Sequence, residues 1–101
     1  MSSFPYAIED LPGGTLVAKG LDDLRLQALT PEALLVIIAA PALVRVGAAL
    51  PALPALDTDA ELILYRQLQE DAADPYSSYN ALLRELVSFT RACALRVRQA
   101  A

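Results

Sequence analysis

Residues 30–40 read TPEALLVIIAA, and this stretch decides the fold. Thr30 is a favoured N-cap, Pro31 fits the first helical position, and Glu32 suits the positive end of the helix dipole. Every residue from 34 to 40 is apolar. A helix without a polar face is buried on all sides, so this segment predicts the central helix of the fold.

Prolines follow this helix and shape the next part of the chain. Pro41 is expected to end or kink the helix, and residues 42–50 then suit a second short helix. Pro51 and Pro54, with leucines at every third position from 50 to 56, predict a stiff, extended connector.

Two further helices are indicated in the second half. Thr58-Asp59-Ala60-Glu61 matches a capping box, which predicts a helix from Thr58 to Ala72. Asp74 is a suitable cap for the longest helix, from about Pro75 to about Arg98. Its predicted apolar stripe is Tyr79, Leu82, Leu83, Leu86, Phe89, Cys93 and Val97, and its predicted outer face is Asn80, Arg84, Ser88 and Arg91.

The charges of these two helices differ in sign. Residues 57–74 carry six carboxylates and one arginine, whereas residues 75–101 carry four arginines and one glutamate. A short connection at residues 72–74 favours antiparallel packing, which would bring the opposite charges close together.

Residues 1–29 are expected to be an irregular N-terminal arm. Turn signals occur at Phe4-Pro5 and over residues 11–14. A short β-prone run at 15–18 suits an edge strand or an extended arm, and the residues from Leu21 suit a helical turn. The predicted fold is therefore all-α: a bundle of three to four helices over 30–101, preceded by this arm.

Composition limits the classes of function. The chain has 101 residues, 55% of them apolar, and a net charge of −4, with a mean hydropathy of +0.40. An acidic balance argues against a nucleic-acid partner. The apolar stretch from Ala33 to Leu56 is long enough to span a bilayer, but Arg45 and the prolines interrupt it, so a buried core or interface is preferred over membrane insertion.

The residues that carry chemistry are few. There is no histidine, and the single cysteine, Cys93, lies on an apolar stripe, so we expect no catalytic, cofactor or metal site. The Asp22-Asp23 cluster with Arg25 is interpreted as a helix N-terminus, and the cluster of Glu70-Asp71 with Asp74 as a solvated helix end. Residues 74–80 are interpreted as a cap with packed tyrosine rings, the alternative being a recognition surface. Gly13-Gly14 is not interpreted as a phosphate loop, because no Lys-Ser/Thr follows it and no helix is expected to start there.

The apolar surplus gives the functional hypothesis. We expect a non-enzymatic interaction protein, a homo-oligomer or accessory subunit, that meets a second chain through residues 34–46 or the proline-rich connector. The alternatives are an acidic inhibitor of a basic partner, of the antitoxin or immunity type, a membrane-associated protein, and an enzyme using carboxylates, Tyr and Arg. No small-molecule substrate is evident. The N-terminus does not resemble a signal peptide, so we expect a cytoplasmic location.

Overall fold

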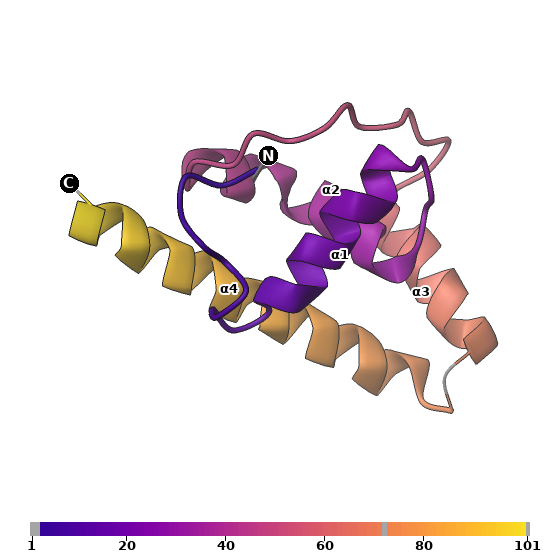
Figure 1. The fold of residues 1–101 in the computed structure, drawn as a ribbon. Helices are drawn as coiled ribbons and strands as arrows, with labels where there is room; N and C mark the ends of the chain where they lie inside the picture. The colour runs from indigo at the N-terminus through magenta and orange to yellow at the C-terminus, as the bar shows by residue number, and fades with distance from the viewer. Residues whose placement is uncertain (1–2, 72, 101) are drawn as a thin grey trace.

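The computed structural model describes residues 3–71 and 73–100, and it confirms the all-α prediction (Figure 1). Four helices follow in order, with no strand among the described residues. They are α1 (Gly14–Arg25), α2 (Pro31–Arg45), α3 (Ala60–Asp71) and α4 (Pro75–Ala100). The connector between α2 and α3 is an extended loop that arches over the bundle (Figure 1).

Helix α1 corrects the prediction for the N-terminal arm. Residues 15–18, expected to be an edge strand or an extended arm, lie inside α1, and the helical turn expected from Leu21 is the second half of the same helix. Val17, Leu21 and Leu24 are buried, and their spacing of four and three places them on one helical face. Packing of this face against α2 outweighs the helix-weakening glycines at its start and middle.

Helix α2 begins as predicted and ends later than predicted. The Thr30 side chain accepts a hydrogen bond from the Ala33 main-chain nitrogen at 3.2 Å, so Thr30 is the N-cap. Pro41 does not end the helix, which continues to Arg45, and no separate helix forms over residues 42–50. The proline is exposed, so its ring displaces no core side chain, and burial on either side of it stabilises the helix.

The core is built around α2. This helix contacts all three others, and its apolar residues at 34–36 are fully buried. Part of the cover comes from the N-terminal segment, where Phe4 and Ile8 are buried. The Phe4 ring meets the Phe89 ring of α4 edge to face, with centroids 5.6 Å apart, a favourable arrangement for aromatic pairs.

Helix α3 begins two residues after the predicted start. The main-chain oxygen of Asp59 accepts hydrogen bonds from Leu62 and Ile63, each at 3.1 Å, which makes Asp59 the residue before the helix. The helix predicted to begin near Thr58 is therefore confirmed, with its first helical residue at Ala60. The predicted end at Ala72 lies outside the described residues.

Helix α4 matches its prediction most closely. Asp74 caps it: its carboxylate accepts from the main-chain nitrogen of Ser77 at 3.1 Å and from the Ser77 hydroxyl at 2.8 Å. On the predicted stripe Leu86, Phe89 and Cys93 are buried, Tyr79, Leu82 and Leu83 are half-buried, and Val97 is exposed. On the predicted outer face Arg84, Ser88 and Arg91 are exposed and Asn80 is half-buried.

The chain reverses between α3 and α4 (Figure 1), and the two helices are in contact. The opposite charges of α3 and α4, expected to lie close together, form no ion pair between described residues. All ion pairs among the described residues involve side chains of α1.

Candidate binding groove

A hollow of about 650 Å³ lies where the N-terminal segment meets the last turns of α2 and α4. We call it the C-terminal groove. In Figure 1 the N-terminal segment passes from the end of α2 towards α4 on this side of the bundle. The groove is lined by Pro5, Tyr6, Val44, Arg45, Val46, Gly47, Arg96, Val97 and Gln99.

The end of α2 forms one wall of the groove. Gly47 has a φ of 99°, a backbone conformation that glycine adopts without steric cost. Its main-chain nitrogen donates to the Val44 oxygen at 3.1 Å, and the Ala48 nitrogen donates to the Leu43 oxygen at 3.0 Å. These two bonds are the Schellman motif, which ends the helix and satisfies its last carbonyls.

Tyr6 holds the N-terminal segment against this wall. Its hydroxyl donates to the Val46 main-chain oxygen at 2.5 Å, and the nearby Ala49 nitrogen donates to the Ser3 oxygen at 2.7 Å. Burial first, and then the neighbouring Cys93 thiol, raise the pKa of Tyr6 to about 12. Tyr6 therefore keeps its proton throughout the neutral range and remains a hydrogen-bond donor.

The groove is lined by both apolar and cationic side chains. Val44 is 57% exposed and Val97 is 41% exposed, so apolar side chains face solvent beside the ring of Tyr6. Arg45 and Arg96 supply the charge, and none of the described residues that line the groove is a carboxylate. Neither arginine forms an ion pair with another described residue. This combination suits binding of a surface that is apolar at its centre and negative at its edge.

A second, smaller hollow lies beneath the proline-rich connector. It has a volume of about 310 Å³ and is lined by Leu24, Gln27, Ala28, Leu29, Ala52, Leu53 and Pro54. Leu53 is 41% exposed. Both hollows thus adjoin the stretch, residues 34–46 and the connector, that the sequence predicts as a contact surface.

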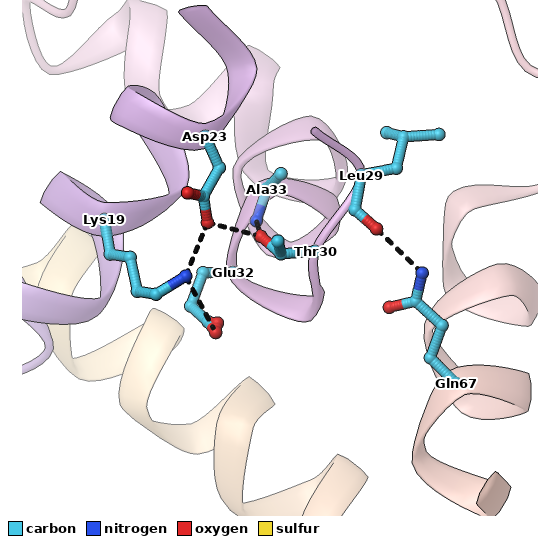
Figure 2. Close-up of polar contacts among 7 residues, drawn as sticks. All are labelled: Lys19, Asp23, Leu29, Thr30, Glu32, Ala33 and Gln67. Atoms are coloured by element: carbon cyan, nitrogen blue, oxygen red, sulfur yellow. Dashed lines mark hydrogen bonds and ion pairs between the residues drawn. The ribbon is translucent and has the colours of Figure 1, made fainter. Parts of the chain in front are cut away.

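Asp23 of the Asp22-Asp23 cluster lies at the junction of α1 and α2 (Figure 2). The cluster is in the last turn of α1 and not at a helix N-terminus, so that prediction is wrong. The Asp23 carboxylate accepts from the Lys19 ammonium at 2.7 Å and from the Thr30 hydroxyl at 2.5 Å. The Lys19 ammonium also lies 3.7 Å from the Glu32 carboxylate. The hydrogen bond from Lys19, followed by the one from Thr30, lowers the pKa of Asp23. These contacts tie the end of α1 to the start of α2.

Further polar contacts hold the junction of α1 and α2. Asp22 pairs with Arg25 at 2.7 Å. On the opposite side of the loop, the Gln67 side-chain nitrogen of α3 donates to the Leu29 oxygen at 2.8 Å (Figure 2). The loop between α1 and α2 is therefore fixed from both sides. The structure assigns this cluster a role in joining helices.

The second carboxylate cluster and Tyr79 behave as the sequence interpretation expects, whereas Tyr76, expected to pack its ring, is exposed. Hydrogen bonds from Ser77 lower the pKa of Asp74, as expected for a carboxylate that caps a helix. The rings of Tyr65 and Tyr79 pack edge to face with centroids 5.9 Å apart. Tyr76 is 66% exposed, so it is the tyrosine of this region that remains available for recognition.

The remaining predicted residues have structural positions. Cys93 is buried as a free thiol, and burial raises its pKa. Gly13-Gly14 begins a helix, contrary to the expectation that no helix starts there. Within residues 3–71 and 73–100 there is no cluster of three side chains suited to hold a metal ion, and no helix that combines the length and apolarity of a membrane span.

Sequence reasoning missed most of the groove. Pro5, Tyr6, Arg96 and Val97 come from the two ends of the chain, and the hydrogen bond from Tyr6 to α2 joins residues 40 positions apart. The apolar and aromatic composition of residues 4–8 was the available signal, because such residues rarely remain exposed in an arm.

Comparisons with protein-family models, with curated proteins and with solved structures find no match for this chain.

Proposed function

We propose that this chain is a non-enzymatic protein-interaction domain, an accessory subunit that binds a second chain through the C-terminal groove. The observation that carries the proposal is the exposure of Val44 and Val97, which line the same hollow as Tyr6. The core of the chain is already complete without these side chains. A second chain that covered them would bury apolar surface, and this burial would contribute to its binding.

The shape of the groove supports a protein partner over a small molecule. Most of its lining residues are exposed, whereas a small-molecule site buries about 70–90% of its ligand. A specific protein contact needs at least about 1,000 Å² of total buried surface. The groove would then be the centre of such a contact, and the surrounding ends of α2 and α4 would be its rim.

Charge distinguishes this proposal from an inhibitor of a basic partner. Arg45 and Arg96 would repel a basic surface at the groove, so this site does not support that alternative. We place the interaction in the cytoplasm, because Cys93 is a free, buried thiol and a reducing compartment preserves thiols.

Site-specific photo-crosslinking tests the proposal. A photoreactive amino acid is placed at Val44 or Val97 in the full chain, expressed in cells of its native source. The matched control position is Leu62 on α3, which is 42% exposed. We expect a discrete adduct at both groove positions and none at Leu62, with the adduct identified by mass spectrometry as a second copy or another protein. Equal labelling at all three positions, or none, would contradict the proposal.

A further inference from the structure

We infer that the occupant of the C-terminal groove is an acidic amphipathic segment of a different protein. The inference rests on the proposed function and adds the chemistry of the partner. It follows from the distribution of charge around the groove, which is the opposite of the charge of the whole chain.

The chain has a net charge of −4, yet cations gather around this groove. Arg45 at the end of α2 and Arg96 at the end of α4 both line it, with no carboxylate among the lining residues. The sequence of α4 holds four arginines and one glutamate. An approaching segment therefore meets a locally positive surface, which attracts carboxylates at long range.

The two arginines have free bonding capacity. Neither is in an ion pair with a described residue, and a guanidinium binds a carboxylate through two parallel hydrogen bonds. Val44, Val97 and Tyr6 line the same groove. A segment that alternates apolar side chains with carboxylates would place the first on the valines and the second on the arginines.

The same charges argue against a second copy of this chain. The commonest homodimer has a two-fold axis, which places the same patch of both subunits face to face. Each copy would then bring Arg45 and Arg96, and no carboxylate among the described lining residues, to the shared interface. Such like-charge contacts disfavour the symmetric dimer.

A binding titration with a defined probe tests this inference. The probe is a fluorescein-labelled helical peptide of leucine and glutamate, and the readout is fluorescence anisotropy. Two further peptides replace every glutamate with glutamine or with lysine. We expect the glutamate peptide to bind, the glutamine peptide to bind about tenfold more weakly, and the lysine peptide to bind more weakly still.

Matched double variants locate the binding. The first, Arg45→Gln with Arg96→Gln, should weaken binding of the glutamate peptide about tenfold. The control, Arg84→Gln with Arg91→Gln, removes the same charge from exposed positions of α4 outside the groove. It should change the affinity by less than about twofold. Raising the salt concentration should remove most of the difference between the variants.

Several outcomes would overturn the inference. Equal binding of the glutamate and glutamine peptides would do so, as would displacement of the probe by a single-stranded oligonucleotide. Dimerisation in light scattering that Val44→Ser abolishes would identify a second copy as the occupant. If any one of these three outcomes occurs while crosslinks form at Val44 and Val97, the proposed function stands and only the inferred partner chemistry fails. Absence of both crosslinks and peptide binding would refute the proposed function itself.

Discussion

Replacing Phe4 with alanine tests whether the N-terminal segment is part of the folded core. Phe4 is 4% exposed and its ring packs edge to face on Phe89. Truncation of a buried phenylalanine costs about 3–5 kcal/mol of unfolding free energy. A domain of this size has about 5–15 kcal/mol in total, so the variant loses a large share of it. A loss of about 4 kcal/mol corresponds to a fall in Tm of about 15–30 °C.

Urea unfolding followed by far-ultraviolet circular dichroism measures this change. Tyr76→Ala is the control, because Tyr76 is 66% exposed, and its unfolding free energy should change by less than about 0.5 kcal/mol. The unfolding free energy of Phe4→Leu, which keeps most of the apolar volume, should lie between those of Phe4→Ala and Tyr76→Ala. A Phe4→Ala protein as stable as the control would refute the reasoning. The N-terminal segment would then not pack on α4, and Pro5 and Tyr6 would not line a groove.

Three further perturbations test individual parts of the fold. Gly20→Ala would place a methyl group 2.4 Å from the Glu32 main-chain oxygen. Although alanine ordinarily stabilises a helix, this variant should therefore lower the unfolding free energy by about 1–3 kcal/mol. A raised Tm would contradict the close packing of α1 on α2. Leu86→Ala should cost about 2–5 kcal/mol, whereas Arg84→Ala should cost less than about 0.5 kcal/mol, and equal shifts in Tm would disprove the assigned faces of α4. Because the pKa of Asp74 is lowered from 3.8 in the fold, its stabilisation is present above that value and is lost as the pH falls through the lowered pKa. The difference in Tm between wild type and Asp74→Ala should therefore shrink in acid, and a pH-independent difference would contradict the cap.

The parts of the fold that short-range signals determine could be predicted from the sequence. Thr30 and Asp74 cap their helices through bonds to residues three positions on, and such bonds depend only on local sequence. The apolar stripe of α4 was predictable as far as Cys93 for the same reason. Beyond it Val97 is exposed, because the end of α4 borders the groove rather than the core.

The errors arose where packing outweighs local preference. Gly14 and Gly20 disfavour a helix, but burial of Val17 and Leu21 against α2 stabilises α1. Pro41 lies within α2, where a local rule predicts an end. Two acceptable caps in succession, Thr58 and Asp59, left the start of α3 undetermined by sequence. For α1 and α2 the deciding burial comes from distant parts of the chain, which periodicity does not reveal.

The groove was the least predictable feature, because three separate segments form it. The sequence indicated that apolar surface near residues 34–46 would exceed what the chain covers. Val44 is the part of that stretch that is both exposed and beside a hollow. The wall contributed by Tyr6 and the cation of Arg96 depend on the return of the N-terminal segment across the bundle.

An amide-resolved nuclear magnetic resonance titration with the leucine–glutamate peptide tests binding through this groove most directly. The chain has a mass of 10.8 kDa, which suits the method. We predict that the largest shift changes fall at residues 5–6, 44–47 and 96–99, with little change at residues 80–91. Changes centred on the hollow beneath the connector, at residues 24–29 and 52–54, or no saturable change at any residue, would contradict the account.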